Sequence, residues 1–486
     1  MNPLSPEQTP PPLWQAVLFP ALAGGMGWGI RGQYGHETGA MIAGLLVSLT
    51  LALLWVRAAP FQPVARAVAW GTLAMGLGGS MTYGQTIGLT QNAPLIGHWP
   101  ALGWGMLGLA LKGGVWIGLA GAFLGMGLGG RRYRTREMIG LLLGLGGLCA
   151  LGIQLVNEPF DPARRVLPRV YFSADWRWYP EATDLQPRRE VWGGLWLAWL
   201  GLVAWLHRVK RDRLAVCLAG WGVLGGAVGF PLGQCLQGFH AWNPDLFQTG
   251  PWVWLAPRLN WWNWMETTFG AVMGAALGLG LWRHRTRLGP APAETAPPLP
   301  GAVEAALLGL HAVLLTGAEL LKLPALERAY DFGLVMAALP LVAVTRGRLA
   351  PWLVLGPVTL LPIAGKTALR ALQDWPAAPP ALMWTLLVAL PLAGTLAVAG
   401  RWARRAEAGN EPAGAWLPTA LAGAAWLYLA LNWLVFQFPW PWAPWTARTP
   451  NALAFLACAA GLTWLAWCLR RPAVPAASPA SVNSRG

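Results

Sequence analysis

Six ionisable side chains fall in or beside long apolar stretches of the sequence, where a charge is costly. They are Arg31, His36, Glu37, Lys112, Glu190 and Glu266. Ionisable groups within apolar segments are rare and commonly mark a functional site. Pairing of Arg31 or Lys112 with Glu37 or Glu266 would lower the cost of burying each charge. The set therefore predicts either a polar site at one end of a helix bundle or a group of ion pairs that holds hairpins together.

Four short strings share one pattern: a pair of glycines, a short stretch, another glycine and then a glutamine. The strings are GGMGWGIRGQ (24–33), GGSMTYGQ (78–85), GGLCALGIQ (146–154) and GGAVGFPLGQ (225–234). Glycines let helix backbones approach closely in lipid, so the pairs could be packing seams. Alternatively, glycine followed by glutamine marks a helix that unwinds and lines a cavity with free backbone and amide groups. In that case Gln33, Gln85, Gln154 and Gln234 surround one cavity.

Three histidines, His36, His98 and His240, lie in predicted loops on the same side of the membrane. Together with Glu37 or Glu266 they could bind a divalent cation, but none of the spacings typical of a zinc site is present. We therefore predict no metal site. His36 could instead transfer protons beside Glu37, because an imidazole titrates near neutral pH. His240 is retained as a candidate contact of a bound molecule.

The composition excludes several classes of protein. Of 486 residues, 55% are hydrophobic and 11% are charged, less than half of the charged fraction usual in soluble proteins. Disorder and an ordinary water-soluble enzyme are thereby excluded. The sequence contains no P-loop, no G-x-S-x-G elbow and no glycine-rich dinucleotide motif, so no cofactor is expected. The five cysteines form no C-x-x-C motif and are expected to be packing residues.

Apolar runs that could cross a bilayer dominate the chain. A bilayer core about 30 Å thick needs roughly 20 residues of apolar helix. Fourteen runs approach or exceed this length: 13–30, 38–56, 64–84, 102–128, 138–156, 190–207, 214–235, 262–282, 302–321, 330–345, 350–365, 380–400, 413–436 and 451–469. The predicted fold class is an all-α polytopic membrane protein with about fourteen transmembrane helices.

Basic residues indicate how these helices are oriented. Arginines and lysines cluster at every second boundary: 131–136, 208–213, 283–287, 346–348, 401–405 and 470–471. The positive-inside tendency places these clusters and both termini in the cytoplasm. The net charge of +15 is then an orientation signal, because the cytoplasmic side has 21 basic and 7 acidic residues and the outer side 14 and 13. The first twelve residues lack the features of a signal peptide, so we expect the first helix to be retained in a bacterial inner (plasma) membrane.

The Pro/Ala-rich stretch 288–301 divides the chain. Before it, residues 13–287 are expected to form an eight-helix bundle of four repeated hairpins, because the four strings end the odd-numbered helices. After it, residues 302–471 are expected to form a six-helix bundle for support or oligomerisation. Residues 1–12 and 472–486 are expected to be cytoplasmic tails, the second of them disordered.

Three functions are compatible with these features, and we rank the carrier first. In a secondary transporter or carrier, the glutamines ring a cavity, and Glu37, Glu266 and Lys112 provide coupling or charge complementarity. The second function is a membrane-embedded transferase that uses a lipid-linked sugar or acyl donor on the outer face. The third is an assembly subunit in which glycines and tryptophans serve packing. The expected partners are the lipid bilayer and a small solute or lipid-linked substrate, and an oligomer is compatible with the sequence. Nucleic acid is excluded as a partner, because no basic soluble domain is present.

Two outer loops bear on the transferase alternative. Residues 157–189 contain VYFSADWRWY (170–179), and residues 236–261 are rich in tryptophan. Aromatic rings beside charged groups can stack on sugars and bind phosphates, although such rings also form belts at membrane interfaces. The chain is similar in outline to multi-span polyprenyl-sugar glycosyltransferases, which have many spans, an acidic residue in the first outer loop and aromatic-rich outer loops. This likeness implies Glu37 as general base and Arg31 as phosphate contact.

Overall fold

The computed structural model describes residues 10–32, 34–289, 297–330, 333–408, 411–436 and 445–470. Within this part of the chain the regular elements are helices, with two isolated β-bridges, one of which joins Pro60 to Pro412. In these described ranges, eight helices are long and apolar enough to cross a membrane. The chain therefore has the helices of a multi-pass membrane protein, as its composition predicts.

Some of the eight are continuous, and others are joined across a π-helical turn. They are α1 (Leu13–Arg31), α5 (Trp99–Leu128), α6 (Thr135–Gly152, continued to Asn157), α8 (Arg213–Trp242), α11 (Gly301–Glu319), α14 (Ala350–Leu353) joined to α15 (Thr359–Asp374), α16 (Pro380–Trp384) joined to α17 (Leu390–Ala408), and α19 (Thr449–Leu469).

The other helices are shorter or less apolar. They are α2 (Ala40–Trp55), α3 (Phe61–Leu77), α4 (Gly84–Gln91), α7 (Trp192–Trp205), α9 (Trp252–Leu255), α10 (Trp261–Arg283), α12 (Pro324–Tyr330), α13 (Gly333–Arg346) and α18 (Leu417–Phe436). Each of the fourteen predicted runs coincides largely with a helix or a joined pair, but only eight have the length and hydropathy of a span. A count of fourteen spans therefore stays a prediction.

Helix α2 is enclosed by the rest of the fold. Its sequence, AMIAGLLVSLTLALLW, is apolar on every side, and all sixteen residues are buried. It packs against α1 and α3 and, from the second half of the chain, against α18. At 1.5 Å per residue it is about 24 Å long, which is shorter than a bilayer core. A helix that is apolar all round and surrounded by protein belongs to the core of the molecule.

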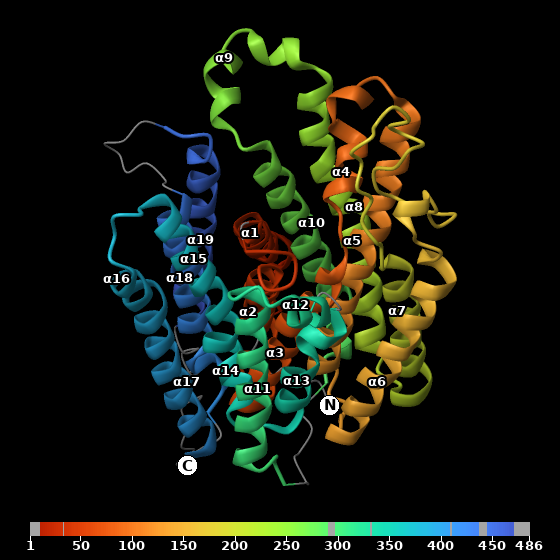
Figure 1. Cartoon of the computed structure of the whole chain (residues 1–486). Coiled ribbons are helices and arrows are strands. Elements are labelled where there is room, and N and C mark those ends of the chain that lie inside the picture. Colours follow the sequence, from red (N-terminus) through yellow and green to blue (C-terminus); the bar gives the residue numbers. More distant parts are fainter. Residues whose placement is uncertain are drawn as a thin grey trace, which may run out of the picture.

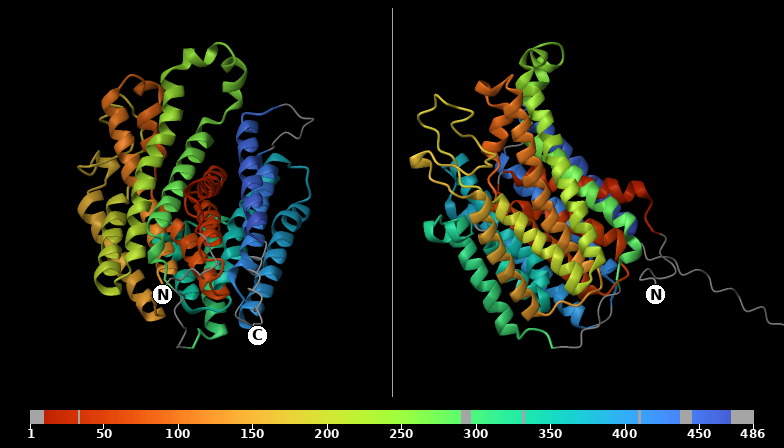
Figure 2. Two further views of the ribbon diagram at one scale, coloured as in Figure 1. Left: turned by 180° about the vertical axis from the view of Figure 1, so that it is seen from behind. Right: turned by 90° about the vertical axis from the view of Figure 1, so that its right-hand side faces the viewer.

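The two halves of the chain share an extensive interface. Helices α1, α2 and α3 lie between a group formed by α5–α8 on one side and α14–α19 on the other, and both views from opposite sides agree (Figures 1 and 2). Within this interface α19 packs on α1, α18 on α2, and α13 on α3. The amide of Gln62 donates hydrogen bonds to the carbonyl oxygens of Gly347 at 3.1 Å and Arg348 at 2.8 Å.

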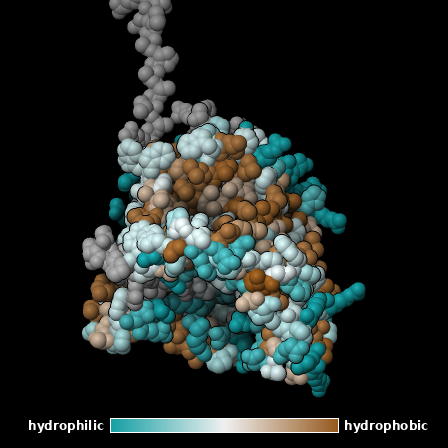
Figure 3. Space-filling model, turned by 90° about the horizontal axis from the view of Figure 1, so that it is seen from above, coloured by the Kyte–Doolittle hydropathy of each residue, from teal (hydrophilic) through white to brown (hydrophobic). Residues whose placement is uncertain are grey.

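Apolar side chains cover the outer faces of several helices. Leu143 on α6, Val313 on α11 and Leu390 on α17 are all exposed. Such faces suit contact with hydrocarbon. At the end that carries α9, hydrophilic residues are gathered beside hydrophobic ones and border a hollow (Figure 3). The surface thus combines apolar sides with a more polar end.

Glycines set the closest approaches between helices. Where α5 packs against α8, a Cβ added at Gly226 would lie 1.9 Å from the carbonyl oxygen of Gly113. Where α1 packs against α10, a Cβ added at Gly24 would lie 2.1 Å from that of Gly270. Glycine is thus required at these crossings, as expected for helices held together by close packing in lipid.

The four glycine strings are not equivalent in their surroundings. The glycine pair that begins the first string packs against α10. In the fourth string Gly225 packs against α10 and Gly226 against α5, and the pair of the second string packs against Trp116 and Glu37. A Cβ added at Gly146 or Gly147, the pair of the third string, meets no atom within 4 Å. The repeated hairpin stays a prediction, because the shared pattern does not correspond to one shared contact.

Substitution at these glycines tests the packing. We expect Gly226→Ala to lower the melting temperature in detergent by several degrees, because the new methyl group overlaps the α5 backbone. The matched control is Gly220→Ala on the same helix, where a Cβ meets no atom within 4 Å. Alanine is the better helix former, so this control should leave the melting temperature unchanged or raise it. Equal effects of the two variants would contradict the packing role.

Candidate functional site

Two helices stop inside the molecule rather than at its end. Helix α1 ends at Arg31, and α3 ends at Leu77, seven residues before the end of the predicted run 64–84. A short turn after α3 packs on its surroundings: a Cβ added at Gly78 would lie 2.4 Å from the Trp116 ring, and one at Gly79 would lie 2.6 Å from Cα of Glu37. Trp116 belongs to the middle third of the 30-residue helix α5. Both helix ends therefore lie beside the middle of a long neighbour.

Arg31 and Glu266 form a buried ion pair between α1 and α10. Nη2 of Arg31 donates to Oε1 of Glu266 at 2.8 Å, and each side chain is 1% exposed. The same Oε1 accepts hydrogen bonds from the hydroxyl of Tyr83 at 3.1 Å and from the indole nitrogen of Trp262 at 2.9 Å. Nη2 of Arg31 also contacts the Tyr83 hydroxyl. One carboxylate oxygen therefore receives three donors.

Aromatic rings enclose the guanidinium group of Arg31. Its Cζ lies 5.0 Å from the ring centroid of Trp28, 5.2 Å from that of Tyr83 and 5.9 Å from that of Trp116. A cation is attracted to the face of an aromatic ring, and most strongly where water is excluded. These rings therefore offset part of the cost of removing the charge from water.

Two polar atoms of the pair have no hydrogen-bond partner. They are Oε2 of Glu266 and Nε of Arg31, and both are buried. Gly32 lies directly beside Oε2, since an added Cβ would be 2.2 Å from this oxygen, and Gly32 itself is exposed. Its backbone is right-handed helical, a conformation open to any residue, so the position needs a small residue rather than a flexible one. The unpartnered oxygen therefore lies next to exposed backbone.

His36 lies against the ion pair. Its Nδ1 is 3.3 Å from Nη1 of Arg31, and its ring meets that of Tyr83 edge-on at 4.7 Å between centroids. A guanidinium only donates hydrogen bonds, so Nδ1 accepts and is unprotonated. Burial, with the positive charges of Arg31, Lys366 and Arg188, lowers the pKa of His36 to about 3. The ring is neutral near pH 7, which disfavours the proton transfer expected of it at that pH.

The second half of the chain supports the turn that carries His36. Nζ of Lys366, on α15, donates to the carbonyl oxygen of Tyr34 at 2.6 Å and to Oγ1 of Thr38 at 3.2 Å. Lys366 also pairs with Glu319 at the end of α11. The hydroxyl of Tyr34 is 3.2 Å from that of Thr367. One turn of α15 thus holds the segment between α1 and α2 in place.

Lys112 and Glu190 form a second buried pair, separate from the first. Nζ of Lys112 donates to Oε1 of Glu190 at 2.7 Å, to Oγ1 of Thr86 at 2.8 Å and to the carbonyl oxygen of Thr82 at 2.7 Å. All three of its donors are therefore used. Both oxygens of Glu190 are also bonded, Oε1 by Ser173 and Oε2 by backbone and indole groups. This saturated pair joins α5 to the long loop 158–191.

The glutamines that end the strings have different surroundings. Gln33 lies outside the described residues. Gln85 bonds the carbonyl oxygen of Gln186 and the backbone nitrogen of Arg188, both in the long loop. Gln154 is exposed on the continuation of α6, and buried Gln234 bonds Oγ1 of Thr90 at 2.8 Å. Among the described residues no hydrogen bond joins these glutamines to one another, so a common ring is not seen.

The remaining candidates are His240 and Glu37. His240 stacks on Trp261 with 4.3 Å between ring centroids. Glu37 is close enough to Arg31 to interact with its charge. In the described part of the chain no three His, Cys, Asp or Glu side chains gather closely enough to hold a metal ion. The structure therefore brings together Arg31, His36, Glu37 and Glu266, and places Lys112 in a different cluster.

The sequence analysis missed several residues of this site. Tyr83 lies within the second string, but the repeated pattern is defined by its glycines and glutamine and gives no signal for the tyrosine. Trp28, Trp116 and Trp262 have no local signal, because tryptophan occurs 33 times in the chain. Lys366 directly follows the predicted run 350–365. Nothing in the sequence predicts that Lys366 contacts Tyr34, which is 332 residues earlier in the chain.

No protein-family model matches this chain, and neither the curated proteins nor the solved structures include a significant match. The site must therefore be interpreted from its own geometry.

The strength of the Arg31–Glu266 pair can be measured with a double-mutant cycle. We expect Arg31→Met or Glu266→Met alone to destabilise the protein by about 3–5 kcal/mol, because each leaves a buried charge uncompensated. The double variant should be less destabilised than the two single effects added together. Melting temperatures in detergent provide the comparison. Strict additivity would show that the two charges do not stabilise each other.

His36 makes stability depend on pH. The pKa of His36 is lowered in the folded state. Below about pH 6.5 the imidazole is therefore protonated in the unfolded chain but stays neutral in the folded protein. Stability from this residue is complete above pH 6.5 and falls as the pH drops towards 3, by up to about 1.4 kcal/mol per pH unit. Melting curves between pH 8 and pH 4.5 should show a steeper loss for wild type than for His36→Gln. Parallel loss in both proteins would refute this origin.

Proposed function

We propose that this protein is a secondary membrane carrier of fourteen spans, with both termini in the cytoplasm of a bacterial inner membrane, and that Arg31 and Glu266 form its binding site. The observation that carries the proposal is the uneven state of the Glu266 carboxylate: Oε1 accepts three hydrogen bonds, whereas buried Oε2 accepts none. A buried polar atom without a partner is uncommon in native proteins and requires an explanation. A bound solute that donates to Oε2 provides one.

The position of the pair supports a carrier. Helices α1 and α3 both end beside the middle of α5, and transporters commonly build their sites where helices are interrupted within the membrane. The free backbone at such a break is tolerated only where protein or a cavity surrounds it. Exposed Gly32, next to Oε2, is the natural point of entry from the outer side.

The surroundings of the pair favour a small solute with a hydroxyl or amine donor on a flat or apolar body. The donor would reach Oε2 of Glu266, and the rings of Trp28, Trp116 and Trp262 would flank the remainder. Both charged side chains are almost fully buried, so this arrangement corresponds to a closed state. Opening at Gly32 would admit the solute.

A transferase is the second candidate, since Glu37 lies within electrostatic reach of Arg31, as a base beside a phosphate contact would. An assembly subunit is the third. The three differ in what reaches Oε2: a free solute for the carrier, a lipid-linked donor for the transferase and nothing for the assembly subunit. A functional assay of the purified protein can therefore separate them.

The experiment reconstitutes the protein in liposomes and measures uptake from a panel of labelled polyols, sugars and amines. We expect uptake of at least one solute by wild type and a loss of at least about tenfold in Gly32→Ala and Glu266→Gln, because each change disturbs Oε2 (~1.4 kcal/mol for each factor of ten). The control for the glycine change is Gly220→Ala. The control for the carboxylate is Glu190→Gln, which weakens a buried pair outside the site and should change uptake per folded molecule by no more than about twofold.

One outcome would overturn the site, and two would overturn the carrier. Full uptake by Glu266→Gln would place the site elsewhere. Product formation from a lipid-linked sugar or acyl donor, without solute uptake, would identify the transferase. An absence of any solute or donor effect, combined with copurification of a stoichiometric partner chain, would identify the assembly subunit.

A further inference from the structure

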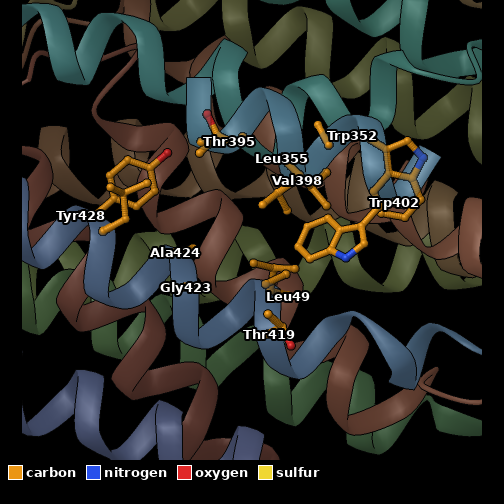
Figure 4. Close-up of a pocket in the computed structure, with 15 residues that line it drawn as sticks. Leu49, Trp352, Leu355, Thr395, Val398, Trp402, Thr419, Gly423, Ala424 and Tyr428 are labelled. Carbon is orange, nitrogen blue, oxygen red and sulfur yellow. The ribbon is translucent and has the colours of Figure 1, made fainter. Parts of the chain in front are cut away.

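A cavity of about 220 Å³ lies in the second half of the molecule, apart from the Arg31–Glu266 site. Helices α2, α14, α17 and α18 and the turn after α14 form its walls. Its lining is almost wholly apolar, and the side chains converge on a common space between α17 and α18 (Figure 4). The hydroxyl of Thr395, one of the few polar groups present, is bonded to the backbone of its own helix.

The cavity opens sideways, towards the surface that a membrane would cover. Gly394 and Val398 on α17 and Gly423 on α18 line it and are exposed, whereas Leu49 and Trp352 on the opposite wall are buried. The joined helix α16–α17 is the least enclosed of the eight candidate spans, with 11% of its apolar window buried. The opening between α17 and α18 therefore faces hydrocarbon if these helices cross a bilayer.

The length of the cavity suits a lipid chain. Along α17 the lining extends from Gly394 to Trp402, which is about 12 Å of helix. The chains of one leaflet occupy about 15 Å of a core about 30 Å thick. The ring of Tyr428 lies at the end near Thr395, and that of Trp402 lies at the other end (Figure 4).

Two cationic residues, Arg401 and Arg404, flank Trp402 along α17. Arg401 and Arg404 are exposed on the same helix, and among the described residues no ion pair is found for either. Neighbouring Arg405 differs, because it pairs with Glu411 at 2.7 Å. Arginines at the end of a membrane helix attract anionic lipid headgroups. An apolar cavity with cations at one end is complementary to an amphipathic anion.

We propose that this cavity binds one acyl chain of an anionic glycerophospholipid of the bilayer, with its headgroup against Arg401 and Arg404. The chain enters between α17 and α18 and lies on α2 and Trp352. The lipid thereby contacts α2, the enclosed central helix, through Leu49. This site is independent of the carrier proposal, since no residue is shared with the Arg31–Glu266 pair.

Native mass spectrometry of the detergent-solubilised full chain tests the proposal, with phosphatidylglycerol and phosphatidylethanolamine of identical chains as probes. We expect wild type to bind one phosphatidylglycerol about tenfold more tightly than phosphatidylethanolamine. Gly394→Leu and Gly423→Leu add a side chain to the lining of the cavity, at positions where a Cβ meets no atom within 4 Å. Each should weaken binding of both lipids by about tenfold.

Matched controls separate the cavity from the general surface. Gly309→Leu, on α11, also adds an exposed leucine where a Cβ meets no atom, but outside the cavity, and should bind both lipids as wild type does. Arg401→Gln combined with Arg404→Gln should abolish the preference for phosphatidylglycerol and retain phosphatidylethanolamine binding. Arg283→Gln, an exposed arginine at the end of α10, should retain the preference.

Melting temperatures in the same detergent identify any variant that is unfolded. Gly394 and Gly423 lie on different helices that line the cavity, so if one leucine variant fails to fold, the other still tests the site. Wild-type binding of phosphatidylglycerol by both folded cavity variants would overturn the site. Equal affinity of wild type for the two lipids would overturn the assignment of an anionic headgroup.

Discussion

A charge buried away from water is stable only where protein groups replace its hydration. The arrangement of the helices around the Arg31–Glu266 pair meets this requirement. The two residues are 235 positions apart, on the first helix and the tenth. Their contact requires α1 to lie against α10, and the rings of Trp28 and Trp116 require α5 to lie close by. The glycine crossings between these helices are what allow such close approach.

The two buried pairs illustrate two uses of charge in an apolar setting. Lys112 and Glu190 satisfy each other and every remaining donor and acceptor, so the pair resists change and fixes the long loop to α5. Arg31 and Glu266 have the same type of contact but leave an oxygen and a nitrogen unpartnered. A polar network with unpartnered atoms is less stable than a fully hydrogen-bonded one, and a bound molecule that supplied the missing hydrogen bonds would stabilise it. Two buried ion pairs of the same fold thus differ, since one is fully hydrogen-bonded and the other only in part.

The sequence was most informative about what depends on local composition. Helix positions follow from the length of apolar runs, and the cost of charge in apolar segments singled out Arg31 and Glu266, which form a buried ion pair. The choice of partner did not follow: Lys112 was as suitable for Glu266 as Arg31 was, and the Lys112–Glu190 pair was not foreseen. The early end of α3 was also missed. The predicted run continues to residue 84 because residues 78–84 contain no charged side chain, whereas α3 ends at Leu77 and Gly78 packs against Trp116.

The glutamine pattern was less informative about contacts. A repeated residue suggested one shared cavity, but Gln85 bonds a loop, Gln154 is exposed and Gln234 bonds Thr90. Spacing along the chain shows which residues recur. It does not show where each side chain points once the helices have packed. Tryptophan misled in a similar way, since its abundance hid the few rings that enclose Arg31.

The enclosure of α2 affects how the protein can be made. Helix α2 leaves the ribosome early, yet α18, which covers part of it, is synthesised more than 360 residues later. Until α18 is synthesised, α2, an all-apolar helix about 24 Å long, lacks part of its covering and has to be in contact with lipid or an insertion factor instead. Completion of the core therefore requires the synthesis of α18, and a chain interrupted within the linker lacks the helix that covers α2.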